Sequence, residues 1–364
     1  MTGCSKDIME PENNIEPENN APQMTLTTNK SGRVQFIMLG SGTVTINWET
    51  GKKETYTLGD DPWDVSSRYQ YIYSTESTHT ITITGENITY LDCGSSPSSS
   101  FGSFTSLDVS NNTALTYLDC KLNLLTSLDV SNNTALTYLD CQFNQLTNLD
   151  VSKNTVLKHL DCTATQLTSL DVSKNVALEI LECGVNQLIN LDVSQNTALT
   201  DLYCGSNPLT DLNVSSNTAL TTLNCVMNQL ASLDVNKNTA LEYLNCWGNQ
   251  LTSLNVSNNT ELTYLHCGPN LLTSLDVSNN PELQYIICRN NQLTSLDLSN
   301  NIKLIQLYCE NNQLTAESLN TLFNTLHSQN FGWRKSIFMF GNPGTDTCDQ
   351  SIAENKGWTI EIAY

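Results

Sequence analysis

The chain has 364 residues, of which 37 are acidic and 16 are basic, and its formal net charge is −21. This negative charge argues against nucleic acid and against an anionic membrane surface as partners, and repulsion between copies favours a monomer. No apolar run approaches the ~18 residues that a membrane-spanning helix needs, so any membrane attachment requires another kind of anchor.

Residues 1–23 predict a disordered tether. They contain the motif EPENN twice and few apolar side chains, which is too little to form a packed core. The start, Met1-Thr2-Gly3-Cys4, resembles the end of a bacterial lipobox. That resemblance implies that Cys4 carries lipids and that the tether holds the folded part away from the membrane. A chance cysteine beside an initiator methionine is the alternative.

Residues 24–87 predict a small antiparallel β-sandwich. Strand-like runs separated by Gly, Asp and Ser clusters occupy residues 34–39, 44–48, 55–58, 69–73 and 78–84. The stretch TVTINWETGKKETYTL resembles PKD-like immunoglobulin-fold modules, from which Asn47, Glu49 and Thr50 depart. Since this module directly precedes Ile88, we expect it to cap the first edge of the array that follows.

Residues 88–314 consist of a 21-residue repeat, which predicts a solenoid. In the unit LTYLDCQFNQLTNLDVSKNTV, residues 136–156, apolar residues occupy positions 1, 4, 6, 11, 14 and 16, and asparagine occupies position 9. Alternation across positions 3 to 7 predicts a short strand, with Leu139 and Cys141 facing the core and positions 3, 5 and 7 facing outward. Stacked units form a parallel sheet whose open edges occur only at the two ends.

Eleven of the 13 cysteines occupy position 6, and from Cys120 to Cys309 their interval is always 21 residues. Metal ligands usually lie about two to four residues apart, and the chain contains no CxxC motif. Successive thiols lie ~4.8 Å apart in such a sheet, but parallel side chains rarely reach the ~90° dihedral of a disulfide. We therefore expect buried free thiols, no metal site and no cofactor.

Two polar positions of the repeat predict turns. Position 9 is asparagine in each repeat from residue 115 to 314 except at Thr165, and its amide can satisfy backbone groups where the strand ends. Position 15 carries aspartate or, at Asn213 and Asn255, asparagine. Both residues form Asx-turns, so this exchange favours a turn. A calcium-binding column of carboxylates is the alternative.

Residues 95–103, SSPSSSFGS, lengthen the first interval between cysteines and predict a surface loop. The leucine pattern stops after Leu314, and residues 315–364 predict an α/β cap on the last edge. We expect helices over 316–327 and 346–356, and strands over 337–340 and 359–362. Cys348 is expected to pack within this cap.

The pattern LxxLxCxxNxLxxLDVSxNT resembles the 21-residue cysteine-containing leucine-rich repeats of internalin J and similar bacterial surface proteins, including secreted and lipid-anchored proteins of Bacteroides-type bacteria. The resemblance implies an α/β-type leucine-rich-repeat solenoid, mostly β, with a parallel sheet on its concave face, between a β-sandwich cap and an α/β cap. It also implies a location on the bacterial cell surface, anchored by lipid to the outer membrane or secreted.

A search for catalytic motifs finds none of HExxH, GxSxG, GxxxxGK or GxGxxG. The four histidines lie in different elements, and His159 and His266, which share the outward strand face, are five repeats apart. The stacked carboxylates Asp119, Asp140 and Asp161 are interpreted as a solvated face. The sequence therefore predicts that the protein is not an enzyme.

The outward strand positions vary most in the C-terminal half. Aromatic side chains and arginine, which are enriched at binding hot spots, gather there on four neighbouring strands: Tyr243, Trp247, Tyr264, His266, Tyr285, Arg289 and Tyr308. Tyrosine also suits strands for structural reasons, but that does not explain Trp247, where most other repeats have glycine or a polar residue. We predict that these seven residues form a ligand-binding surface.

Two functions fit this reading. The first is a recognition or adhesion protein that binds a host or microbial surface protein, or a glycan, on its concave face. The second is a structural spacer of the cell envelope without a discrete ligand site, which the near-identity of the repeats favours. The sequence does not separate a protein ligand from a glycan.

Overall fold

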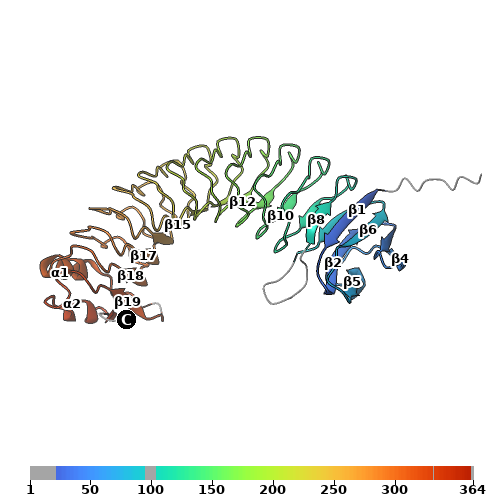
Figure 1. Cartoon of the computed structure of the whole chain (residues 1–364). Coiled ribbons are helices and arrows are strands. Elements are labelled where there is room, and N and C mark those ends of the chain that lie inside the picture. Colours follow the sequence, from blue (N-terminus) through green and yellow to red (C-terminus); the bar gives the residue numbers. More distant parts are fainter. Residues whose placement is uncertain (1–21, 95–103, 331, 362–364) are drawn as a thin grey trace, which may run out of the picture.

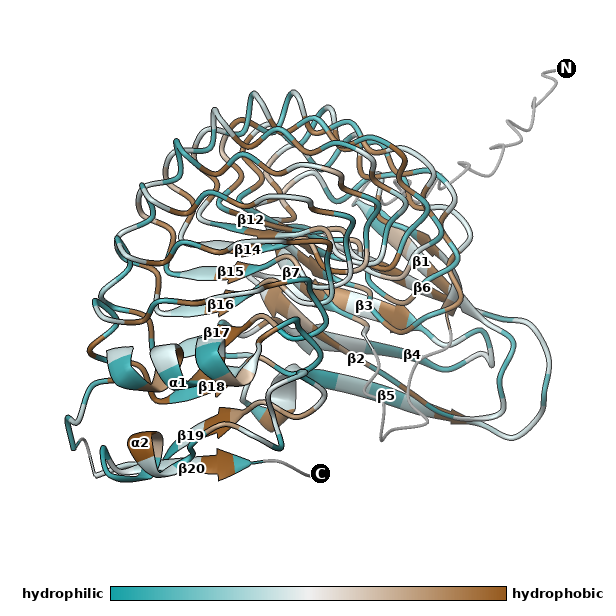
Figure 2. Ribbon diagram, turned by 90° about the vertical axis from the view of Figure 1, so that its left-hand side faces the viewer, coloured by the Kyte–Doolittle hydropathy of each residue, from teal (hydrophilic) through white to brown (hydrophobic). Residues whose placement is uncertain are grey.

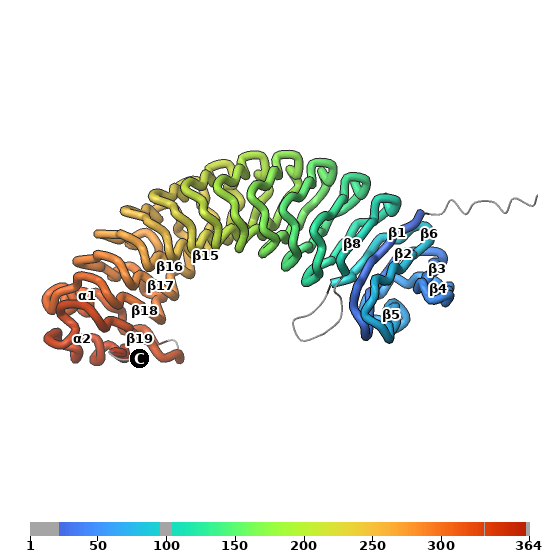
Figure 3. Tube along the Cα trace, in the orientation of Figure 1, coloured from blue at the N-terminus to red at the C-terminus, as the bar shows by residue number. Residues whose placement is uncertain are grey.

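The structure is a computed structural model that describes residues 22–94, 104–330 and 332–361. The described chain forms an arc, with a β-sandwich at one end and a small α/β unit at the other (Figure 1; Figure 3). The predictions for Cys4, for residues 1–21 of the tether and for the loop at 95–103 lie outside the described residues, whereas Gln23, the last residue of the predicted tether, begins a strand.

The N-terminal unit has two sheets. Its strands are β1 (Gln23–Thr28), β2 (Gly32–Gly40), β3 (Thr43–Asn47), β4 (Lys53–Thr57), β5 (Arg68–Tyr73) and β6 (His79–Gly85), with a 3-10 turn η1 (Val65–Ser67) before β5. Trp48 and Phe36 are fully buried between the sheets, and the Trp48 indole donates to Glu54 at 2.8 Å. Strand β1 was not predicted, because only Met24 and Leu26 mark its buried face.

The solenoid contributes one short parallel strand per repeat to a 15-stranded sheet. Figure 2 shows β12 and β14–β18 stacked in sequence order. Most of these strands span only positions 3 to 5 of the repeat. They are β7 (Ile88–Asp92), β9 (Tyr117–Asp119), β10 (Tyr138–Asp140), β11 (His159–Asp161), β12 (Ile180–Glu182), β13 (Asp201–Tyr203), β14 (Thr222–Asn224), β15 (Tyr243–Asn245), β16 (Tyr264–His266), β17 (Tyr285–Ile287) and β18 (Gln306–Tyr308).

Both sheets of the sandwich continue into the first repeat of the solenoid. Strand β2 pairs antiparallel with β7, so the concave sheet of the solenoid continues into the sandwich. On the other side of the first repeat, β8 (Phe104–Asp108) pairs antiparallel with β1. At the first edge of the repeat array, both β7 and β8 are thus paired with strands of the sandwich. An open sheet edge would leave the backbone N–H and C=O groups of these strands without partners.

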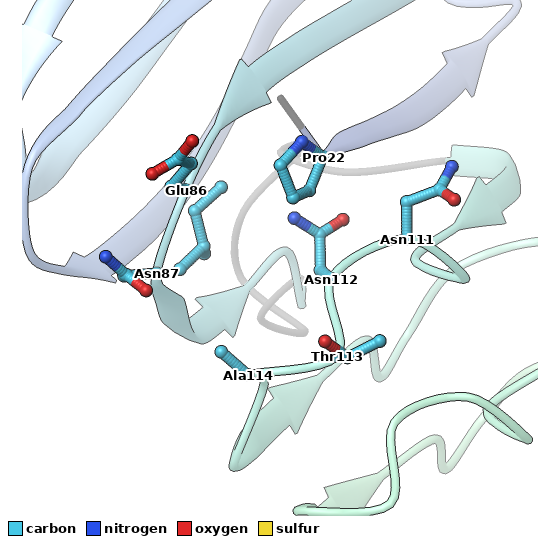
Figure 4. Close-up of a pocket in the computed structure, with 8 residues that line it drawn as sticks. Pro22, Glu86, Asn87, Asn111, Asn112, Thr113 and Ala114 are labelled. Atoms are coloured by element: carbon cyan, nitrogen blue, oxygen red, sulfur yellow. The ribbon is translucent and has the colours of Figure 1, made fainter. Parts of the chain in front are cut away.

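A small hollow of about 240 Å³ remains at this junction (Figure 4). Pro22, Glu86 and Asn87 line it from the sandwich, and residues 111–114 line it from the first repeat. Of the described residues that line it, Glu86 alone is titratable.

The core of the solenoid confirms the prediction for position 6. All eleven ladder cysteines are buried and free, among leucines that are themselves buried. Cys141 donates its thiol to the carbonyl of Asp161 in the next repeat, at 3.4 Å. Burial raises the pKa of Cys141 well above its ordinary value, so the thiols stay protonated and act as small apolar side chains.

Position 9 also behaves as predicted. The side-chain amide of Asn207, for example, donates to the backbone carbonyls of Cys183 and Cys204 at 3.0 and 3.1 Å. Its side-chain oxygen accepts the backbone N–H of Leu188 at 3.0 Å. The exception, Thr165, donates to Cys162 only through its hydroxyl, and the next residue, Gln166, has a positive φ of 86°. The amide thus sets the shape of the turn.

The Asx-turns at position 15 are confirmed. Asp129 accepts the N–H of Ser131 at 2.9 Å, and Asn213 accepts the N–H of Ser215 in the same way at 3.0 Å. A second set of buried asparagines at position 19 binds the repeats to one another: Asn154 donates to the carbonyls of Val130 and Asn133.

The C-terminal unit extends the same sheet. Strands β19 (Lys335–Phe338) and β20 (Trp358–Glu361) pair parallel with it, after helix α1 (Ala316–Thr325). The prediction of a helix over 346–356 is largely wrong: α2 (Ser351–Glu354) is a single turn, and turns occupy most of the rest. Cys348 is partly buried against the core, and Lys356 donates to three carbonyls at the C-terminal end of α1.

Candidate ligand-binding surface

In the N-terminal half of the concave face, the position-3 side chains form a stack. The rings of Tyr90, Tyr117 and Tyr138 lie 4.2 Å apart and nearly parallel, and His159 continues the row at 4.6 Å. Each ring covers its neighbour, so this part of the column behaves as cross-strand packing rather than as an open site.

Beside the stack runs a row of acidic side chains at position 5, which we call the acidic row: Asp92, Asp119, Asp140, Asp161 and Glu182. The interpretation of these carboxylates as a solvated face is wrong, because Asp119, Asp140 and Asp161 are only 2–4% exposed. The short aspartates fold back to accept the backbone N–H two residues ahead, at 2.9–3.1 Å, and the tyrosine rings lie beside them. The alternation in the sequence correctly placed these carboxylates on the outward face of the strands, but it did not predict that they are buried there.

Among the described residues, Lys121 forms salt bridges with the acidic row, and the charge of Arg68 also acts on Asp92. Lys121 contacts Asp119 at 2.6 Å and Asp140 at 3.1 Å. Burial raises the pKa of Asp119 to about 6 against the opposing effect of Lys121, and burial together with repulsion from Asp161 raises that of Glu182 to about 7. The surroundings of the acidic row therefore disfavour the negative charge of Asp119 and Glu182, and Lys121 offsets this only in part at Asp119.

In the C-terminal half, the structure brings the predicted tyrosines together on β15, β16 and β17. Tyr243 and Tyr264 pair across the strands and stack at 4.5 Å with 7° between their planes. Tyr285 lies 6.1 Å from Tyr264 and is tilted by 42°. All three side chains are half-buried, so they present rigid ring edges and hydroxyls to the concave side.

His266 lies at the centre of this group. Its ring is 6.4 Å from those of both Trp247 and Tyr264, and among the described residues its Nε2 has no hydrogen-bond partner. Burial, and after it the charge of Arg289, lowers the pKa of His266 to about 4. The imidazole is therefore neutral at pH 7 and adds apolar surface rather than charge.

Tyr308 is placed differently from the other six predicted residues. Its ring stacks on Phe338 of β19 at 4.3 Å and 2°, and its hydroxyl donates to Gln306 at 3.0 Å. The aromatic surface thus extends into the C-terminal unit through Phe338, which sequence reasoning missed because β19 lies outside the repeat register.

A hollow of about 390 Å³ adjoins Trp247 where the chain leaves the strands. Its lining is mostly apolar and, with Trp247, includes Pro208, Met227 and Pro269, one from each of four consecutive repeats. Sequence reasoning missed this hollow too, although prolines at these repeat positions were a visible signal.

No group of three or more His, Cys, Asp or Glu side chains that could hold a metal ion occurs within residues 22–94, 104–330 and 332–361. The arrangement offers shape, aromatic area and charge, which are the properties of a binding surface. No helix in these ranges is long and apolar enough to cross a membrane.

Comparison with solved structures places this architecture. The functional domain of InlJ from Listeria monocytogenes, which includes a cysteine ladder, matches with a TM-score of 0.50 and 36% identity, over 69% of this chain and 64% of that domain. The chain has the leucine-rich-repeat fold with a cysteine ladder in its core. It spans less than two thirds of the InlJ domain.

Two further structures share the fold of this leucine-rich-repeat protein at lower identity. An internalin, InlF, from Listeria monocytogenes matches with a TM-score of 0.61 and 22% identity, over 76% of this chain and 87% of that one. The leucine-rich-repeat domain of APL1B matches with a TM-score of 0.52 and 22% identity, over 64% and 69%. No protein-family model matches the chain, and neither does any curated protein.

Proposed function

We propose that this leucine-rich-repeat protein is a bacterial recognition or adhesion protein, exposed on the cell surface or secreted, that binds a protein or a glycan through its concave face. The aromatic patch is defined as Tyr243, Trp247, Tyr264, His266, Tyr285, Arg289 and Tyr308. The observation that carries the proposal is that most of these side chains lie together on β15–β17, half-buried on a rigid sheet.

Rigidity supports binding here for a physical reason. The sheet beneath the patch is held by parallel strand pairs and by the asparagine and cysteine ladders, so little conformational entropy is lost when a ligand contacts the rings. Aromatic side chains supply large contact area with few rotatable bonds.

The alternative is a structural spacer of the cell envelope without a ligand site. The regularity of the repeats favours it, since the same turns and ladders recur along the solenoid. The tailoring of position 7 at Trp247 and Arg289 favours recognition instead.

The test is binding of the full chain to an array of purified extracellular host proteins and to a glycan array. We expect the variant Trp247→Ala/Tyr264→Ala to lose at least ten-fold in affinity for the ligand found, since such residues act as hot spots. The control is Tyr117→Ala/Tyr138→Ala, which removes two stacked aromatic side chains in the other half of the concave face, at the repeat position of Tyr264. Equal binding by both variants and the unaltered chain, or no ligand on either array, would favour the spacer.

The location rests on the resemblance and on Cys4. If Cys4 is lipidated, metabolic labelling with a fatty acid will mark the unaltered protein and not Cys4→Ser. Labelling of both proteins would contradict the proposed anchor. The proposed state in solution is a monomer, which sedimentation tests directly.

A further inference from the structure

The turn that follows each strand places one residue, at repeat position 8, in the left-handed region. We call this row the exit edge: Leu122, Phe143, Ala164, Val185, Ser206, Met227, Gly248, Pro269, Asn290 and Asn311. Except at Pro269, φ is positive throughout. The backbone bonding is also shared, because Val185 donates to Gly205 at 2.9 Å just as Asn290 donates to Glu310 at 2.8 Å. The conformation therefore does not depend on the residue present.

The residues chosen at this position differ sharply between the two halves of the solenoid. Glycine and asparagine tolerate a left-handed backbone, and Asn290 and Asn311 bind each other there at 2.9 Å. Phe143, Val185 and Met227 have the same conformation, although it is strained for a bulky or β-branched side chain. They are also 50%, 56% and 53% exposed. Neither folding nor solubility explains these three side chains, whereas contact with a partner does.

Large and small residues alternate along this stretch. Phe143, Val185 and Met227 are separated by Ala164 and Ser206, so a large side chain projects from every second repeat, roughly 10 Å from the next at the spacing of parallel strands. Ser206 and Met227 touch, at 3.9 Å between Oγ and Sδ. The last of these three projecting side chains, Met227, lines the apolar hollow beside Trp247. Two turns of an α-helix rise ~10.8 Å, so side chains seven residues apart on a helix match the gaps in this row.

Charge identifies the partner further. Position 5 of the repeats that contain Phe143, Ala164 and Val185 carries Asp140, Asp161 and Glu182 of the acidic row, three residues before the exit edge, whereas the repeats of Ser206 and Met227 carry Tyr203 and Asn224 there. Lys121 contacts Asp140 at 3.1 Å. A helix is ~10–12 Å wide and can cover both rows at once. Glycans stack on aromatic rings rather than on valine or methionine. A second copy of this chain does not fit, since neither described helix, α1 or α2, carries a lysine or arginine.

We propose that the exit edge from Phe143 to Met227 docks an amphipathic helix of a partner protein, with its apolar face on the three projecting side chains and its lysines or arginines beside Glu182, the part-exposed member of the acidic row. This inference rests on the proposed recognition function and names the chemistry of the partner. The docked helix would lie beside the aromatic patch, with the hollow at Trp247 at its end.

The test uses a synthetic amphipathic peptide of about 20 residues, with leucine at heptad positions and lysine beside it. Its affinity is measured by fluorescence anisotropy against the full chain and against Phe143→Asn/Val185→Asn/Met227→Asn. Asparagine is the residue found at Asn290 and Asn311, so this variant keeps the fold and the charge, which a thermal melt verifies. We expect the triple variant to weaken binding at least ten-fold and the peptide to gain helical circular dichroism on the unaltered chain.

Two controls separate this inference from the proposed function. The variant Tyr264→Ala/Tyr285→Ala alters the aromatic patch alone, and we expect it to bind the lysine peptide within about two-fold of the unaltered chain. A peptide with glutamate in place of lysine is expected not to bind. Equal affinity for the triple variant and the unaltered chain, binding of the glutamate peptide, or no binding of the lysine peptide overturns the helix proposal. If only the tyrosine variant loses affinity for the lysine peptide, the helix proposal is overturned as well, but binding at the aromatic patch is supported.

Discussion

Replacement of Asn207 by alanine tests how the solenoid turns are held. The Asn207 amide donates to the carbonyls of Cys183 and Cys204, and its oxygen accepts the N–H of Leu188. The bonds join two repeats, all partners are buried, and alanine can replace none of them. Water cannot reach the freed groups unless the turn opens.

The magnitude follows from the number of bonds. Each hydrogen bond contributes about 1 kcal/mol net to stability, and more where a buried partner is left unsatisfied. Three bonds predict that Asn207→Ala lowers the free energy of unfolding by about 3 kcal/mol. Urea unfolding followed by circular dichroism measures this as a lower midpoint with an unchanged slope. A loss below about 1 kcal/mol would show that the turns are held by packing rather than by the amides.

Two variants serve as controls for this prediction. Asn132 is exposed and makes one bond, to Ser110, so Asn132→Ala is expected to cost less than about 0.5 kcal/mol. Thr165 occupies the position of Asn207 in its own repeat, where the following Gln166 takes a left-handed φ. Thr165→Asn restores the amide and is expected to stabilise the protein by about 1 kcal/mol.

Three further predictions follow from the same contacts. Burial raises the pKa values of Asp119 and Glu182 above their unfolded values. The folded state therefore takes up more protons than the unfolded state as the pH falls from about 7.5 to 5, and this stabilises it. The lowered pKa of His266 opposes this effect. The melting temperature should rise over this range, and less so in Glu182→Gln; a fall contradicts the reasoning. Val185→Asn is expected to raise stability by up to about 1 kcal/mol, because it relieves left-handed strain, and an unchanged or lower urea midpoint would argue against strain. Iodoacetamide should not label Cys204 in the native protein at pH 8, since burial raises the pKa of its thiol well above the ordinary value, and mass spectrometry of native against unfolded samples detects any labelling.

Much of the solenoid could be predicted because its repeat is local and periodic. The alternation around Leu139 and Cys141 sets which side chains enter the core, and a fixed interval makes one assignment hold for every repeat. The turns at Asn207 and Asp129 were predictable for the same reason, since each is satisfied by backbone a few residues away or one repeat away. The aromatic patch could be predicted from the alternation of outward and inward strand positions alone, although its role in binding stays a prediction.

Features that depend on neighbours outside the repeat required the tertiary structure. Strand β1 has two buried apolar residues, Met24 and Leu26, and becomes a strand because β6 and β8 pair with it on both sides. Residues 346–356 carry a helical pattern, but only Ser351–Glu354 form a helical turn there.

The surface shows the same division. Sequence alone determined that Asp119 points away from the core, because side chains alternate across positions 3 to 7 of the repeat, but Phe143 at position 8 lies beyond that alternation. Only the stacked structure decided that Asp119 is covered while Phe143 stands exposed in a strained turn, because exposure depends on the side chains of adjacent repeats. Direction is a property of one repeat, and burial is a property of the stack.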